Sequence, residues 1–301
     1  MDPVVEHNTT KIPLNHQKSP SPWVIARRKF LKNKIAMIAL VFLVFITVIS
    51  FLAPYITTED PAKVNIAKLM KAPSADNWLG TDNGGRDIFT RLLYGGRVSL
   101  TIGFIATLNI TIIGTLIGAV AGYFGGKVDA WLMRFTDFIM VFPFLIFVIV
   151  LNAIFPKSGI SALIFVISVL GWGGVARLVR SKVLSEKEND YIAAAISIGT
   201  PASKVIYKHL LPNVISTVIV QATILLASMI VFETGISFLG FGVPQTIPSW
   251  GNMISPARNP NVIQFKPWIW MPPGIVLTLT ILSVNFVGEG LKDAFNPKSN
   301  R

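Results

Sequence analysis

The sequence contains no cysteine, and its only histidines are His7, His16 and His209. The absence of cysteine excludes disulfide bonds, thiol catalysis and cysteine-ligated metal sites. The three histidines lie too far apart in the sequence to indicate a metal centre. We therefore expect this chain to bind no metal and no cofactor of its own.

A phosphate-binding loop is also missing. Such a loop needs the pattern GxxxxGK[ST], whose backbone N–H groups surround the phosphates. The nearest candidate, Gly126-Lys127, has Ala121 in place of the first glycine and Val128 in place of the serine or threonine. No other cluster of acid, base, nucleophile or metal ligands stands out. The chain is therefore not expected to be an enzyme, and any ATP hydrolysis must belong to another chain.

Charged residues are scarce. They make up 14% of the 301 residues, while hydrophobic residues make up 52%, and soluble domains typically carry about 25% charge. A helix crosses a bilayer with about 20 apolar residues. Six runs without Asp, Glu, Lys or Arg are close to that length: 35–56, 98–122, 138–155, 159–176, 214–232 and 268–288. The sequence predicts an all-α integral membrane protein with six transmembrane helices, the third and fourth forming a hairpin around Pro156-Lys157-Ser158.

The net charge is +12. No motif for RNA or DNA recognition accompanies this charge, so we expect no nucleic-acid partner. With six spans, most of the 27 lysines and arginines lie in the segments that share one side of the membrane with both termini. Because basic loops favour the cytoplasmic side, both termini are predicted to be cytoplasmic.

The N-terminal segment 1–34 is predicted to be a cytoplasmic tail that ends in a membrane-surface helix. Residues 22–34 mix Trp23, Ile25, Phe30 and Leu31 with five cations, which is typical of an amphipathic helix lying on lipid. The first span, 35–56, is followed by a predicted extracytoplasmic loop, 57–97.

The second span carries Gly114, Gly118 and Gly122 at intervals of four residues. Glycines at this spacing line one face of a helix and allow another backbone to approach closely. The alternative is the ordinary enrichment of glycine in membrane helices. Because three glycines share this spacing, a helix-packing face is favoured over chance enrichment.

Few polar residues interrupt the spans. They are the amides Asn109, Asn152, Gln221 and Asn285, with Glu233 and Glu289 at span ends. Amides commonly bond across helices as part of the scaffold, and we expect the two glutamates to reach interfacial water. No pair of acidic residues and no inverted repeat is evident, which disfavours a proton- or sodium-coupled carrier.

The segment 177–213 is predicted to be an ordered cytoplasmic loop. Asp190 can cap a helix from Tyr191 to about Ile198, and Gly199 suits the left-handed position that ends it. Thr200 can cap the next helix, with Pro201 at its first position. That helix is expected to reach about Leu210, before Pro212 and the fifth span. The apolar positions of the two helices must be covered either by the protein itself or by a partner. They are Ile192, Ala195, Ile196, Val205 and Ile206.

The same loop carries a family resemblance. Ala193-Ala194-Ala195, Gly199 and the run His209-Leu210-Leu211-Pro212 resemble the EAA signature of ABC importer permeases, whose form is Glu-Ala-Ala, three residues, Gly, nine residues, Ile-x-Leu-Pro. Ala193 replaces the usual Glu and His209 replaces the usual Ile. These replacements leave the helix-turn-helix pattern in place but remove the charge that the glutamate would supply.

Further motifs, in order along residues 22–297, resemble the C-type permease subunits of dipeptide and oligopeptide importers. They are Trp78-Leu79-Gly80-Thr81-Asp82, Gly85-Arg86-Asp87, the run from Arg91 to Leu100, Ser237-Phe238-Leu239-Gly240-Phe241-Gly242, Ser249-Trp250-Gly251-Asn252-Met253 and the run from Gly288 to Ala294. The resemblance implies a type I importer permease fold with its core at 98–290 and a cytoplasmic tail at 291–301.

The resemblance also implies a function and partners. The glycine loop would form a coupling helix seated in a separate ATPase, which holds ATP and magnesium. The residues that carry over are Ala194, Ala195, Gly199, Thr200, Pro201, Leu211 and Pro212. The other implied partners are a homologous second permease and an extracytoplasmic binding protein that delivers peptides in a bacterial cell membrane. In that setting the loop 57–97 serves as a docking or gating surface or as a lid, since its acidic residues lack the spacing of a calcium loop. Nickel or another small solute is the alternative substrate, and a six-span secondary carrier or channel is the more distant alternative.

Overall fold

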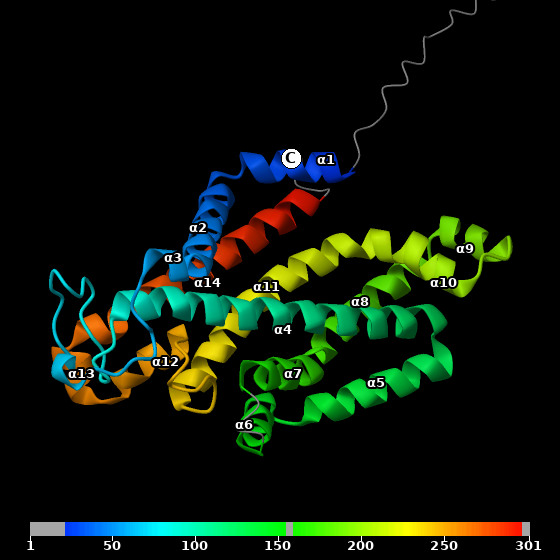
Figure 1. Cartoon of the computed structure of the whole chain (residues 1–301). Helices are drawn as coiled ribbons and strands as arrows, with labels where there is room; N and C mark the ends of the chain where they lie inside the picture. The colour runs from blue at the N-terminus through cyan, green and yellow to red at the C-terminus, as the bar shows by residue number, and fades with distance from the viewer. Residues whose placement is uncertain (1–21, 155–158, 297–301) are drawn as a thin grey trace, which may run out of the picture.

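A computed structural model describes residues 22–154 and 159–296 (Figure 1). Helices dominate these residues, and no strand occurs among them beyond an isolated bridge between Thr81 and Asp87. The predicted hairpin turn at Pro156-Lys157-Ser158 and the tail up to residue 21 lie outside the described residues. The all-α fold class is confirmed.

The helices follow one another in the order α1 (Pro22–Lys32), α2 (Lys34–Phe51), α3 (Ala53–Ile56), η1 (Ile66–Lys68), α4 (Ile88–Phe124), α5 (Gly126–Val141), α6 (Phe144–Ile154), α7 (Gly159–Gly171), α8 (Gly173–Lys187), α9 (Asp190–Ser197), α10 (Ala202–Val205), η2 (Ile206–Leu210), α11 (Leu211–Leu239), α12 (Trp250–Ile254), η3 (Ser255–Arg258), α13 (Pro260–Phe265) and α14 (Pro267–Phe295).

Four helical stretches in the described residues are long and apolar enough to cross a membrane: α2, α4, the continuous stretch Ala202–Leu239, and α14. Two bent pairs, α5 with α6 at 75° and α7 with α8 at 41°, raise the number to six if each pair is one span. The chain is therefore a multi-pass membrane protein with four to six spans by length and composition.

The runs predicted as the third and fourth spans are each interrupted by a break between two helices. Phe142 is extended, with φ −69° and ψ 132°, since the residue before Pro143 is pushed out of the helical region. The helix therefore turns between α5 and α6 inside the run 138–155. The run 159–176 likewise spans the bend at Trp172 between α7 and α8.

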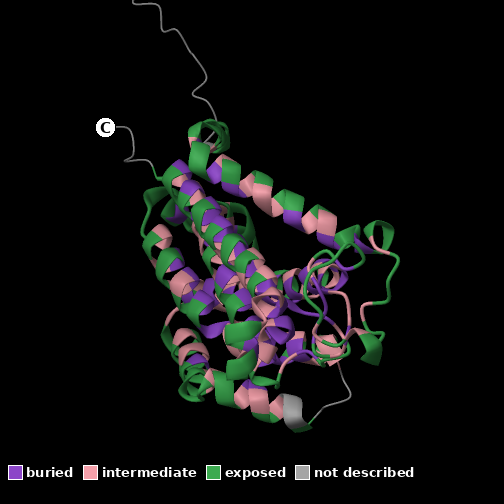
Figure 2. Cartoon of the chain, turned by 90° about the vertical axis from the view of Figure 1, so that its left-hand side faces the viewer, coloured by how far each residue is buried: buried purple, intermediate pink, exposed green. Residues whose placement is uncertain are grey.

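Helix α4 forms the centre of the molecule and packs most extensively on α8, then on α11 and α2. Gly114, Gly118 and Gly122 lie on the face that meets α8. A Cβ at Gly114 would lie 2.6 Å from the Cβ of Val175, and one at Gly122 would lie 2.8 Å from the Cβ of Val183. Figure 2 shows the buried residues between the helices and the exposed ones on the outer surface. Much of that outer surface is apolar, as a lipid-facing surface must be.

Helix α1 lies across the end of α14 (Figure 1). The rings of Trp23 and Phe295 meet edge to face with their centroids 5.2 Å apart. Asn33 separates α1 from α2 and caps α2, because its Oδ1 accepts the backbone N–H of Ala36 at 3.1 Å. The sharp turn at Asn33 sets the first span at an angle to α1.

Candidate functional site

The segment predicted as a loop from residue 177 is helical at its start. Helix α8 continues to Lys187, because Val175, Ala176, Val179 and Val183 form one buried stripe against the glycine face of α4. This helix therefore ends later than predicted. We call residues 188–205, which contain α9 and α10, the corner; it lies at one end of α4 and α11, opposite α12 and α13 (Figure 1).

Asn189 takes the position before the first helix of the corner without a side-chain bond to it, and Asp190 is already in the helix. The predicted cap position is therefore off by one residue. The hydroxyl of Tyr191 donates to Glu186 Oε2 at 3.1 Å and accepts from Asn213 Nδ2 at 2.7 Å. Burial, followed by the hydrogen bond to Glu186, raises the pKa of Tyr191 above its usual range. This hydroxyl joins the end of α8 to the start of α11.

Gly199 ends α9 in the left-handed conformation that the sequence predicts, with φ +79°. The Gly199 N–H donates to Ile196 O at 2.9 Å, and the Thr200 N–H donates to Ala195 O at 3.1 Å. This pair of bonds is the Schellman motif, which satisfies the last carbonyls of a helix. No atom lies within 4 Å of the position of a Cβ at Gly199, so the turn needs glycine for its backbone conformation and not for space.

The second helix of the corner starts one residue later than predicted. Pro201 is its cap, with φ −63° and ψ 146°, and the Val205 N–H donates to Pro201 O at 3.1 Å. From Ala202 the helix runs through the wide turn η2 into α11 without a break. Pro212 therefore lies inside a continuous helix and does not precede it. Proline lacks an N–H and crowds the carbonyl four residues earlier; the local i→i+5 bonding, such as Leu211 N–H to Ile206 O, makes room for it.

The corner buries one apolar face and exposes another. Ile192, Ala195 and Val205 are buried. The protein itself therefore covers most of the five apolar positions that the sequence places in the two predicted helices. Ile196 is 41% exposed and Ile198 is 82% exposed. The Ala193 and Ala194 side chains are exposed as well. The result is a rigid turn with an uncovered apolar tip.

A buried carboxylate cluster lies near the other end of α11. The Glu233 carboxylate is fully buried and accepts the hydroxyls of Ser99 at 2.8 Å and Ser237 at 2.7 Å. Each hydroxyl in turn accepts a backbone N–H, from Trp250 and Val243 respectively, at 3.1 Å. The expectation that Glu233 reaches interfacial water is therefore wrong, whereas Glu289 is exposed. The only sequence signal was that three separate motifs each supply one serine or tryptophan of the cluster.

The segment 57–87 is held in place by charge pairing. Asp82 accepts Arg86 Nε at 3.0 Å and lies 3.4 Å from Arg91 Nε. Both arginines also donate to Gln245 O, at 3.1 and 3.3 Å. Asp87 caps α4 through the Thr90 N–H at 2.7 Å. These bonds fasten the segment to α4 and to the loop before α12. In the described part of the chain, no three His, Asp or Glu side chains gather as metal ligands would.

Comparison with known proteins adds two family matches. Residues 114–301 match the model of the "Binding-protein-dependent transport system inner membrane component", and residues 21–73 match the "N-terminal TM domain of oligopeptide transport permease C".

Curated relatives match along nearly the whole chain. The dipeptide transport system permease protein DppC of Alkalihalophilus pseudofirmus is 38% identical over 95% of this chain and 93% of its own length. The oligopeptide transport system permease protein OppC of Lactococcus lactis is 38% identical, over 92% and 95%. The OppC of Bacillus subtilis is 36% identical, over 94% and 92%.

Proposed function

The chain belongs to the inner membrane components of binding-protein-dependent transport systems, and from this membership we propose that it is one permease subunit of an ATP-driven importer of oligopeptides or dipeptides. It forms half of the pathway, and a homologous second permease forms the other half. One or two separate ATPases bind ATP and magnesium, and an extracytoplasmic binding protein delivers the substrate. Both termini face the cytoplasm of a bacterial cell. The peptide substrate is supported by the names that the relatives carry.

In this proposal the corner is the contact with the ATPase. The supporting observation is the uncovered apolar tip at Ile196 and Ile198, held by a hydrogen-bonded turn on a buried base. An exposed apolar patch on a rigid frame is typical of a docking surface. Ala194, Ala195, Gly199, Thr200 and Pro201 shape that tip, while Leu211 and Pro212 lie in the long helix behind it.

The same helix supplies a path for movement. The stretch Ala202–Leu239 is one helix of 38 residues, roughly 57 Å long at 1.5 Å per residue. It starts at the corner and ends beside the buried carboxylate cluster at Glu233. A displacement of the corner by the ATPase would therefore be carried along this helix toward the opposite end of the molecule.

Two isoleucines of matched exposure test the docking role. Ile198→Ser should reduce the amount of ATPase that co-purifies with the permease pair, because it removes apolar surface from the tip, while Ile198 contributes only backbone atoms to the hydrogen bonds of the turn. Ile66→Ser is the control, since Ile66 is 79% exposed at the other end of the molecule. Equal ATPase recovery from both variants would contradict the assignment.

Uptake measurements test the transport class and the substrate. Labelled dipeptides and oligopeptides should enter cells that keep ATP after their proton gradient has been collapsed, and only when the ATPase and binding protein are present. Uptake of nickel instead of peptides would place the chain in an importer for small solutes. Transport by the purified chain alone, without ATP, would identify a secondary carrier or channel.

A further inference from the structure

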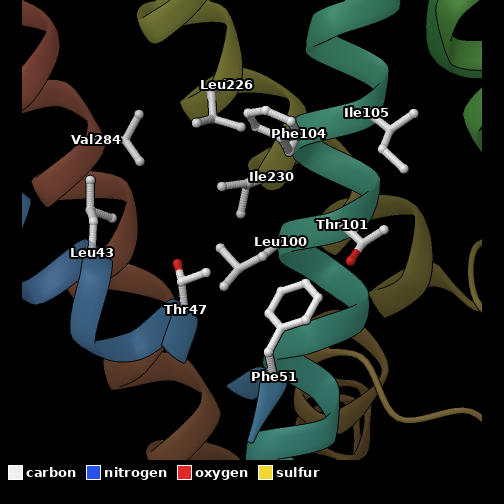
Figure 3. Close-up of a pocket in the computed structure, with 10 residues that line it drawn as sticks. All are labelled: Leu43, Thr47, Phe51, Leu100, Thr101, Phe104, Ile105, Leu226, Ile230 and Val284. Carbon is white, nitrogen blue, oxygen red and sulfur yellow. The ribbon is translucent and has the colours of Figure 1, made fainter. Parts of the chain in front are cut away.

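An apolar cavity of about 470 Å³ lies between α2, α4, α11 and α14 (Figure 3). Its walls consist of eight aliphatic or aromatic side chains and two threonines. They are Leu43, Thr47, Phe51, Leu100, Thr101, Phe104, Ile105, Leu226, Ile230 and Val284. The volume is in the usual range for ligand cavities, about 300–1,000 Å³. None of the lining groups is ionisable.

The cavity opens on the apolar outer surface. Ile230 is fully buried on its inner side, while Phe104 is 60% exposed. The cavity follows a single face of α2, because its lining residues Leu43, Thr47 and Phe51 are spaced by four residues. Helices α2 and α4 touch where Gly96 meets Ser50, and Figure 3 shows Thr47 and Phe51 directed into the space beside Leu100.

A cation stands at one mouth of the cavity. The guanidinium carbon of Arg97 lies 5.8 Å from the centre of the Phe51 ring, and Phe51 and Thr101 are shared with a neighbouring cavity of about 530 Å³ that Arg97 lines. Arg97 is exposed, and within residues 22–154 and 159–296 no carboxylate lies within 4.0 Å of it. An exposed cation at this position is available to an anionic lipid headgroup, which basic residues near a membrane surface attract.

We propose that this cavity binds one acyl chain of an anionic phospholipid, whose phosphate contacts Arg97. The lining suits a hydrocarbon chain and not a peptide, because it offers no ionisable group and only two hydroxyls. One of these, on Thr101, already donates to Arg97 O at 2.6 Å. The planar guanidinium forms paired hydrogen bonds with phosphate oxygens. The site needs only the membrane location of the chain and is independent of the transport proposal.

Native mass spectrometry of the assembled importer tests the headgroup. Retention of dioleoyl phosphatidylglycerol should exceed that of dioleoyl phosphatidylcholine. Arg97→Gln should lower this preference about fivefold, the contribution of one cation near an anionic lipid, and Arg97→Lys should keep most of it. Equal retention of both lipids by the unaltered protein, or an unchanged preference in Arg97→Gln, would overturn the assignment of the phosphate.

The acyl site is tested by filling the cavity. Thr47→Phe should abolish labelling of α2 and α4 by a phosphatidylglycerol that carries a photoreactive group on its acyl chain. Val44→Phe is the control, because Val44 is 55% exposed on the same helix and does not line the cavity. Because the chain has no cysteine, Thr47→Cys is a unique reporter. Cross-linking of that cysteine to the second permease, or unchanged labelling in Thr47→Phe, would overturn the proposal.

Discussion

Replacement of Gly199 tests whether the conformation of the corner controls coupling. At φ +79° a residue with a Cβ suffers a cost of about 1–2 kcal/mol, and a β-branched residue suffers more. Since the Cβ position is free of neighbours within 4 Å, packing adds nothing to this cost. A penalty of 1–2 kcal/mol changes the equilibrium of the turn by a factor of about 5–30.

The assay is the amount of peptide transported per ATP hydrolysed in proteoliposomes that contain the whole importer. This ratio should fall in the order Gly, Asn, Ala, Val at position 199, because asparagine tolerates the left-handed region better than alanine. The fall for Gly199→Ala should not exceed the factor of about 30 that the conformational cost allows.

Two controls separate coupling from general stability. Gly240 has the same kind of strain, with φ +92° and an open Cβ position, but lies at the opposite end of α11. Gly240→Ala should leave ATPase recovery unchanged. Gly174→Ala, in an open helical position without strain, should change neither the peptide transported per ATP nor the recovery of the ATPase. A normal ratio in Gly199→Val would refute the reasoning.

Three further substitutions test other parts of the structure. Glu233→Ala leaves two buried hydroxyls without their acceptor, and should cost about 1–3 kcal/mol per group, seen as a lower thermal unfolding midpoint that Glu233→Gln partly restores. Gly118→Ala places a Cβ against the Ala176 carbonyl oxygen and should cost about 1–3 kcal/mol through overpacking, again measured by thermal unfolding. The raised pKa of Tyr191 means that its contribution to stability is present below the unfolded pKa of about 10 and is lost as the pH rises further; Tyr191→Phe should reduce this alkaline loss in thermal scans from pH 9 to pH 11.

Local signals made much of the helical structure predictable. An apolar run free of charge identifies a buried or lipid-facing helix wherever its own length decides the matter, as for α2 and α14. Gly199 was predictable because glycine alone enters the left-handed region cheaply. The glycines of α4 gave a packing face but not its partner, since spacing within one helix carries no information about the helix opposite.

Cap residues and bends were less predictable because their signals are degenerate. Asn189 and Asp190 are both good caps, and in the folded chain Asn189 takes the cap position while its amide donates to Glu186. Pro143 and Pro212 show the same ambiguity for proline. Pro143 follows the end of a helix. Pro212 lies inside a longer helix, where a local wide turn accommodates it.

The buried Glu233 could not be placed from the sequence for a different reason. Its partners Ser99 and Ser237 come from α4 and α11, and Trp250 closes the cluster from α12. Each partner is an unremarkable residue in its own segment. A carboxylate at the end of an apolar run is therefore equally consistent with water or with burial until the neighbouring helices are in position.

The position of this cluster bears on how α11 can move. Glu233 ties one end of the helix to α4 by accepting the Ser99 hydroxyl, which itself accepts the Trp250 N–H of α12. These bonds lie in a low-dielectric interior and are costly to break. The other end leads through η2, the only departure from regular i→i+4 bonding in the described stretch Ala202–Leu239. A force applied at the corner therefore passes through the irregular turn Ile206–Leu210 before it reaches the buried attachment of α11 to α4 at Glu233.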